Sequence, residues 1–325
     1  MTAQPARPGA ARVAIDCDPG RDDALAILAA LGSPEIHVDL ITTVAGNVTA
    51  ERGAANALGV LAVAGVDDVP VYLGATQPLA RPLVPGSTLH GDMGVSDPPL
   101  PATRGEIAGP AGPALRAWCR EPTDERKLLV AIGPLTNIAA LLVNDPAALD
   151  ALDTLYVMGG SIGQIPTRVS PTAEFNFHTD PEAAVIVIRS GVPIRLFDYD
   201  ATTACQIPVE AIPEIAAGIG GRLGRYVAGW LQHLWEYANR AYGRPGIAIH
   251  DLYAVAGAVG VEPGCWDWRR ISVDTGDLRR GTLDSVPAEP GEGIAVARDI
   301  DPKAMAALLR DSAARLPGAR VEEGA

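Results

Sequence analysis

The sequence predicts an α/β protein in which helices cover a mostly parallel central sheet. Short apolar runs typical of buried strands alternate with helix-forming segments almost throughout the chain. The 325 residues are 48% hydrophobic and 20% charged, which is enough to bury a large core. No repeat and no shift in composition marks a second domain. We therefore expect one domain at residues 12–316, with flexible tails at residues 1–11 and 317–325.

The expected strands are short runs rich in valine, isoleucine and leucine, and several of them end at glycine, asparagine or proline. In chain order they occupy residues 13–15, 36–44, 69–72, 127–132, 152–158 and 192–197, followed by a late β-element at 271–286 and 293–296. The run at 127–132 has no polar residue after its first lysine, which is typical of a strand buried on both faces.

Several of the expected helices begin at residues that favour helix N-termini. Asp22 and Asp23 precede the first helix, where acids are favoured by the helix dipole. Thr49 is a cap for the second, and Pro134 suits the first turn of another. The expected helices lie at residues 24–31, 49–64, after Pro134, from 180, across most of 209–242, at 252–259 and at 302–316.

Four aspartates follow the first strand within eight residues: Asp16, Asp18, Asp22 and Asp23. The Pro19-Gly20 pair between them predicts a tight turn, so the carboxylates gather at the carboxyl end of a strand, where open α/β sheets bind ligands. One or two can be turn formers or helix caps, but four close acids repel one another. A hard cation with oxygen ligands, Ca²⁺ or Mg²⁺, would offset that repulsion. No cysteine–histidine cluster with zinc spacing accompanies them.

Composition narrows the partners and the compartment. The net charge of −13 argues against nucleic acid and against an anionic membrane surface. The four cysteines show no CxxC spacing and indicate a reducing compartment. The first ten residues contain no apolar segment of the kind found in signal peptides, and no apolar run is long enough to span a bilayer. A cytoplasmic protein is therefore expected.

The acidic turn at 16–24 resembles that of the calcium-dependent nucleoside hydrolases, and later motifs follow in the same order as in that family. These motifs are Thr43-Val44-Ala45-Gly46-Asn47, His90-Gly91, Gly133-Pro134-Leu135-Thr136-Asn137, Met158-Gly159-Gly160, Glu174-Phe175-Asn176, Asp180-Pro181-Glu182-Ala183 and His250-Asp251. The resemblance covers residues 12–312 and implies a Rossmann-like nucleoside hydrolase fold. It implies hydrolysis of ribonucleosides to ribose and free base, a role in purine or pyrimidine salvage, and a homodimer or homotetramer.

The resemblance also implies roles for individual residues. It suggests Asp18, Asp23, Asp251 and the main-chain carbonyl of Ile132 as Ca²⁺ ligands. Asp18 would also be the general base that acts on a calcium-bound water. His250 would be the acid that protonates a departing purine, or would lie close to the base.

The remaining implied residues contact the nucleoside: Asp22, Asn47, His90, Arg168, Glu174, Asn176 and Asp251. We expect Glu174 and Asn176 on an extended segment, where a spacing of two places both side chains on one face. Tyr237 or Tyr242 would cover the base or simply pack within a helix.

Two positions depart from the family pattern. Arg168 stands where the family usually has an asparagine that holds the ribose 5′-hydroxyl. Its guanidinium would either be neutralised by Glu174, the outcome that the ring of acids favours, or face an anionic 5′ substituent. Met93 occupies a position usually held by aspartate, with Asp92 one residue earlier.

Two other functions are compatible with part of the sequence. A strand ending in Asp16-x-Asp18 is similar to the aspartyl-nucleophile motif of haloacid dehalogenase phosphatases, although Asp22-Asp23 and the later motifs fit that class poorly. Alternatively, a chain altered at Arg168 and Met93 could bind a nucleoside or pentose without hydrolysing it.

Overall fold

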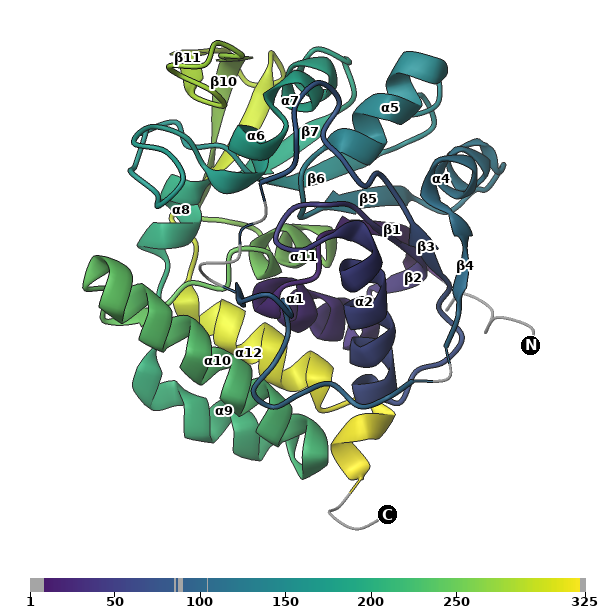
Figure 1. Ribbon diagram of the computed structural model, residues 1–325, viewed down its shortest axis with the longest axis vertical. Helices are drawn as coiled ribbons and strands as arrows, with labels where there is room; N and C mark the ends of the chain where they lie inside the picture. Colours follow the sequence, from purple (N-terminus) through teal and green to yellow (C-terminus); the bar gives the residue numbers. More distant parts are fainter. Residues whose placement is uncertain (1–8, 85, 87–89, 104, 322–325) are drawn as a thin grey trace.

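A computed structural model describes residues 9–84, 86, 90–103 and 105–321 and places their central sheet between layers of helices (Figure 1). The sheet order is β11-β10-β12-β7-β6-β5-β1-β2-β3-β4. Every neighbouring pair from β12 to β4 is parallel, and only the pairs that β10 forms are antiparallel. The predicted fold class, a mostly parallel sheet covered by helices, is confirmed.

The strands of this sheet are β1 (Ala11–Cys17), β2 (Ile36–Thr43), β3 (Val71–Leu73), β4 (Ile107–Pro110), β5 (Lys127–Ala131), β6 (Thr154–Met158), β7 (Ile194–Phe197), β10 (Cys265–Val273), β11 (Leu283–Pro287) and β12 (Ile294–Arg298). A separate antiparallel pair joins β8 (Ile207–Pro208) to β9 (Gly246–Ile247). The central strands β1 and β5 are almost wholly buried, because helices cover both of their faces.

The α-helices are α1 (Arg21–Gly32), α2 (Ala50–Ala64), α4 (Ala111–Arg120), α5 (Thr136–Asn144), α6 (Phe175–Thr179), α7 (Pro181–Ile188), α8 (Tyr199–Ala204), α9 (Ile212–Ile219), α10 (Gly221–Tyr242), α11 (Leu252–Ala258) and α12 (Pro302–Ala313). Thr49 caps α2 by accepting from the amide of Arg52, and Asp180 caps α7 by accepting from Ala183. The sequence predicted the cap at Thr49 and a helix that starts at Asp180. Among the described residues, no helix has the length and apolar character needed to cross a membrane.

The structure differs from the sequence prediction at both ends of the chain. The late β-element expected at 271–286 contains parts of two strands, because the amide of Asp274 donates to the carbonyl of Thr282 and closes a turn between β10 and β11. The sequence predicted a C-terminal tail from residue 317, but the folded part of the chain continues beyond that residue. Residues Pro317–Arg320 form a turn of 3-10 helix, and Gly318 and Ala319 are buried. At the other end, β1 begins at Ala11, and residues 1–8 lie outside the described residues.

The site is positioned by the carboxyl ends of the parallel strands, which meet at one edge of the sheet. The acidic turn follows β1, the segment at 44–47 follows β2, and Ile132 follows β5. Helix α11 lies between the sheet and α1 in Figure 1, and its N-terminus brings Asp251 to the same edge. Segments far apart in sequence therefore supply one site, as is usual for open α/β sheets.

Candidate active site

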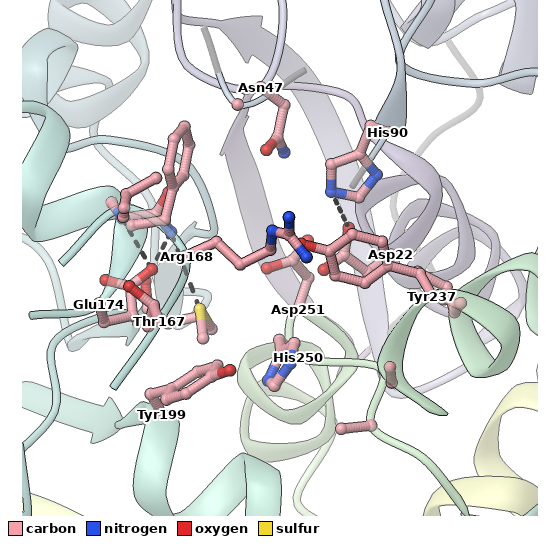
Figure 2. A pocket seen from close by; sticks show the side chains of 18 of the residues that line it. Asp22, Asn47, His90, Thr167, Arg168, Glu174, Tyr199, Tyr237, His250 and Asp251 are labelled. Atoms are coloured by element: carbon pink, nitrogen blue, oxygen red, sulfur yellow. Dashed lines mark hydrogen bonds and ion pairs between the residues drawn. The ribbon is translucent and has the colours of Figure 1, made fainter. Parts of the chain in front are cut away.

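A pocket opens at the carboxyl ends of β1, β2, β5 and β6, and its far wall is formed by α10 and the segment before α11 (Figure 2). Nine of the predicted site residues line it: Asp22, Asn47, His90, Ile132, Arg168, Glu174, Asn176, His250 and Asp251. Asp18 and Asp23 lie directly behind this lining and are fully buried. Thus the structure brings the whole predicted set together.

Three carboxylates cluster at the floor of the pocket, where Asp22 and Asp251 line it and Asp23 lies just behind them. One oxygen from each of Asp22, Asp23 and Asp251 lies within 4.8 Å of the others. Burial and, to a smaller extent, the negative charge of Asp22 together raise the pKa of Asp23 to about 7. The pKa of Asp251 is also raised, first by burial and then by the charges of Asp22 and Asp23. This group carries mutual repulsion that a cation would relieve.

Asp18 completes the cluster from the end of β1. Its Oδ2 accepts a hydrogen bond from the amide of Asn47 at 2.7 Å. Its Oδ1 is buried and has no hydrogen-bond partner among the described residues. Gly46 makes this approach possible, because a Cβ there would lie 2.1 Å from Asp18 Oδ2. Because Gly46 has no side chain, the main chain of the loop after β2 can contact the carboxylate of Asp18.

The cluster fits a hard cation. Asp18 Oδ1 and Asp22 Oδ1 are both buried without a hydrogen bond in the described part of the chain, and His90 Nε2 lies 3.5 Å from the latter. Buried carboxylate oxygens without partners are costly unless they bind a cation or a substrate hydroxyl. Asp16 Oδ2 is also buried without a hydrogen bond among the described residues, but Asp16 Oδ1 accepts from Thr42 Oγ1 at 2.5 Å and from Asn137 Nδ2 at 2.7 Å. It is a structural residue between β1, β2 and α5.

The carbonyl of Ile132 faces the same region and is not free. Asn176 Nδ2 donates to it at 3.0 Å and to the carbonyl of Met158 at 3.2 Å. The amide of Asn176 therefore ties the ends of β5 and β6 together. A carbonyl oxygen has a second lone pair, so Ile132 can accept this bond and still face a cation.

The expectation that Glu174 and Asn176 share one extended segment is wrong, because only Glu174 has extended backbone and Asn176 lies in α6. Glu174 is the N-cap of α6, and its carboxylate accepts from the amides of Asn176 at 2.7 Å, Gly160 at 2.8 Å and Phe177 at 3.2 Å. Burial nevertheless raises its pKa to about 7. The described residues show no ion pair between Glu174 and Arg168. The expected neutralisation of Arg168 is therefore also wrong, because main-chain amides satisfy the carboxylate.

Two histidines face Asp22 from different elements. His90 Nδ1 accepts from the amide of Arg21 at 3.2 Å, and burial lowers the pKa of His90 to about 3. His250 Nδ1 lies 2.8 Å from the hydroxyl of Thr202, and its ring stacks on Tyr199 with centroids 5.0 Å apart. Burial lowers the pKa of His250 to about 4. Both imidazoles are consequently neutral near pH 7.

Aromatic residues from α10 form part of the wall. Tyr237 and Tyr242 both line the pocket and pack edge to face, with centroids 6.2 Å apart. Neither Asp92 nor Met93 is among the lining residues, and Met93 is 47% exposed. The departure from the family pattern at Met93 therefore lies outside the pocket.

Sequence reasoning missed four residues of the site: Thr167, Tyr199, Thr202 and Arg244. Thr167, Tyr199 and Arg244 line the pocket, and Thr202 supports His250 from behind. Arg244 Nη2 donates to the hydroxyl of Tyr199 at 3.0 Å, and its guanidinium lies 4.6 Å from the ring centroid of Tyr242. Only Tyr199 carried a usable signal, since it directly follows a predicted strand end.

The fold and the site define a hydrolase class whose acidic pocket lies at the carboxyl edge of a parallel sheet. The family model for inosine-uridine preferring nucleoside hydrolases matches residues 13–307, and the chain belongs to this family. Its members are ribonucleoside hydrolases, and the chain is an enzyme that cleaves the N-glycosidic bond of ribonucleosides. This finding does not favour a phosphatase or a non-catalytic binding protein.

Individual relatives agree in fold and in class. The pyrimidine-specific ribonucleoside hydrolase RihA of Escherichia coli O1:K1 is 37% identical over 245 residues, which are 75% of this chain and 78% of RihA. A RihA from Photobacterium profundum is 38% identical over the same shares. Among solved structures, the plant nucleoside hydrolase PpNRh1 has a TM-score of 0.82 at 29% identity, covering 93% of this chain and 98% of that one.

Proposed function

We propose that the enzyme hydrolyses ribonucleosides with one Ca²⁺ held by Asp18, Asp23, Asp251 and the carbonyl of Ile132. The observation that carries this proposal is the unpartnered, buried Oδ1 of Asp18 beside the three clustered carboxylates. All four donors are hard oxygens, which Ca²⁺ prefers over softer metals. When bound, the ion would chelate the vicinal ribose hydroxyls and orient a water toward the sugar.

Asp18 is proposed as the general base. Its unpartnered oxygen can accept a proton from the attacking water, while its other oxygen is held by the amide of Asn47. That hydrogen bond fixes the carboxylate in one orientation, so it need not reorganise during proton transfer.

The ribose would lie on the acidic floor. As the glycosidic bond breaks, the sugar gains oxocarbenium character, and the negative charges of Asp22, Asp251 and Glu174 stabilise it. Asn47 and Asn176 supply neutral amide groups at the same edge. The ring of buried groups also limits the water that reaches the sugar.

His250 is proposed to protonate the departing base. Thr202 can donate its hydroxyl proton to Nδ1, which leaves the proton of the neutral imidazole on Nε2. Transfer of this proton to the departing base would leave an imidazolate, which would regain a proton from solvent as Asp18 releases the one taken from the attacking water. His90, on the other side of Asp22, would contact the nucleoside.

The wider setting is also part of the proposal. We expect the enzyme to act in the cytoplasm, where free bases and ribose re-enter purine or pyrimidine salvage, and to form a homodimer or homotetramer. Light scattering of the purified protein measures the oligomer directly. A monomer at micromolar concentration would contradict that part.

The test combines metal analysis with an activity assay. We expect elemental analysis to find calcium and no stoichiometric zinc or iron. Reducing-sugar release from a panel of uridine, cytidine, inosine and guanosine should detect turnover and rank the bases. Asp18→Asn should abolish nearly all of it, whereas Asp150→Asn, an exposed aspartate outside the pocket, should not. Full activity and calcium binding in Asp18→Asn would refute the mechanism.

A further inference from the structure

Arg168 extends into an otherwise acidic pocket. It starts beside Thr167, and Figure 2 shows its side chain crossing the pocket toward the side where Asp22 and Tyr237 lie. Within the described residues, its guanidinium has no ion pair and no hydrogen bond, and the residue is exposed. The other arginine of the lining, Arg244, is already engaged by Tyr199 and Tyr242. Arg168 therefore offers free donors to a ligand.

The loop that carries Arg168 is held in place rather than loose. The amide of Thr167 donates to the carbonyl of Ser170 at 2.8 Å, and the hydroxyl of Thr167 donates to the carbonyl of Ala173 at 3.0 Å. Ser170 Oγ in turn accepts from the amide of Ala173 at 3.1 Å. The hydroxyl of Tyr242 is also hydrogen-bonded to the main chain of Arg168. A fixed backbone lowers the entropic cost of presenting this guanidinium.

The layout of the pocket indicates which end of a nucleoside Arg168 would meet. The carboxylate floor takes the vicinal hydroxyls of ribose. The imidazoles of His90 and His250, with Tyr237, form the side suited to a planar base. The opposite side is the segment from Thr167 to Glu174, and it is left for the C5′ end of the sugar. The main chain of Arg168 lies on that side, and a sugar bound on the carboxylate floor would turn its flexible side chain back from the crossing that Figure 2 shows toward the C5′ end.

We propose that Arg168 binds an anionic group at the ribose 5′ position, so that the preferred substrates are nucleoside 5′-monophosphates. A guanidinium can donate two parallel hydrogen bonds to a phosphate, and this pairing is charge-assisted and geometrically specific. Because Glu174 is satisfied by main-chain amides, it does not compete for Arg168. The proposal rests on the proposed function for the position of the sugar.

The first test measures binding without turnover. Calorimetry with the calcium-loaded enzyme compares ribose 5-phosphate with ribose. We expect ribose 5-phosphate to bind on the order of tenfold more tightly or better, as a charge-assisted contact would give. Arg168→Asn should remove the difference. Arg189→Asn, which changes an exposed arginine at the end of α7 outside the pocket, should leave it intact.

The second test measures kcat/KM for matched pairs: uridine with uridine 5′-monophosphate, and inosine with inosine 5′-monophosphate. The wild type should prefer each monophosphate, and Arg168→Asn should reverse the preference and improve hydrolysis of the plain nucleosides. Orotidine, which carries its anionic group on the base, is the control for position. If orotidine is preferred over uridine while the monophosphates are not, the assignment to the 5′ end is overturned.

The two tests separate this inference from the proposed function. Tighter binding of ribose 5-phosphate that depends on Arg168, without hydrolysis of any substrate, would support the 5′ site and refute the proposed activity. Hydrolysis of nucleosides by a wild type that binds both sugars equally would refute the 5′ site alone. Tight use of inosine or uridine that worsens in Arg168→Asn would also overturn it.

Discussion

His250 illustrates how the pocket controls the state of single residues. His250 precedes Asp251 directly in the sequence. Its hydrogen bond and its ring stacking, however, are supplied by Thr202 and Tyr199, which follow a different strand. Burial lowers the pKa of His250 to about 4, so a proton must be delivered by the neutral ring. The same contacts make two residue-level predictions possible.

His250→Ala should reduce kcat for inosine by about 10²–10⁴-fold, the range for loss of a general acid. It should have a much smaller effect on p-nitrophenyl riboside, because nitrophenolate leaves without protonation. Steady-state assays with both substrates provide the comparison. Equal losses on the two substrates would show that His250 does not protonate the leaving group.

Thr202→Val should lower kcat for inosine by roughly fivefold, since it removes one hydrogen bond worth about 1 kcal/mol. KM should change little, because Thr202 supports His250 and does not line the pocket. Thr202→Ser, which keeps the hydroxyl, should restore most of the activity. If the valine substitution impairs both kcat and KM with p-nitrophenyl riboside, Thr202 has a general structural role.

At the scale of elements, close contacts between helices hold the acidic turn in place. Helix α1 carries Asp22 and Asp23 in its first turn and ends at Gly32, where it packs against α12. A Cβ on Gly32 would lie 1.9 Å from the carbonyl oxygen of Ser312 in α12. The backbone of the neighbouring helix therefore occupies the space of a side chain, and it cannot rotate away as a flexible side chain would.

Gly32→Ala should lower the free energy of unfolding by about 1–3 kcal/mol, the usual cost of overpacking. Urea denaturation followed by circular dichroism would measure it. Gly112→Ala is the matched control, because a Cβ there has open space and alanine favours the helix. A neutral Gly32→Ala would mean that α1 and α12 separate easily.

At the scale of the whole molecule, the cluster of buried carboxylates links cation binding to stability. Asp18, Asp22, Asp23 and Asp251 come from two separate parts of the chain and meet only in the folded state. A cation that binds them binds the native state alone, so its binding energy adds to the free energy of unfolding.

Calcium added to chelator-treated enzyme should raise the melting temperature in a concentration-dependent way. At a thousandfold excess over Kd the gain is about 4 kcal/mol. Differential scanning fluorimetry over a calcium titration would show it. Asp251→Asn should weaken the response, whereas Asp150→Asn should retain it. A melting temperature that does not depend on calcium in the wild type would contradict the proposed site.

The sequence alone determined the fold class and placed Asp18, Asp22 and Asp23 together, because both depend on local patterns, whereas Asp251 was implied only by the resemblance. Buried strands leave apolar runs, and four aspartates around Pro19-Gly20 repel one another wherever the turn lies. The ordered motifs also identified the family. Tertiary structure decided the rest. Thr202 and Arg244 reach the site from other elements, and no local pattern marks them. Glu174 is the N-cap of α6 and accepts from main-chain amides, one of them from Gly160 just after β6, so it leaves Arg168 to face the pocket. Only the tertiary structure, which brings Gly160 to this N-cap, could show this.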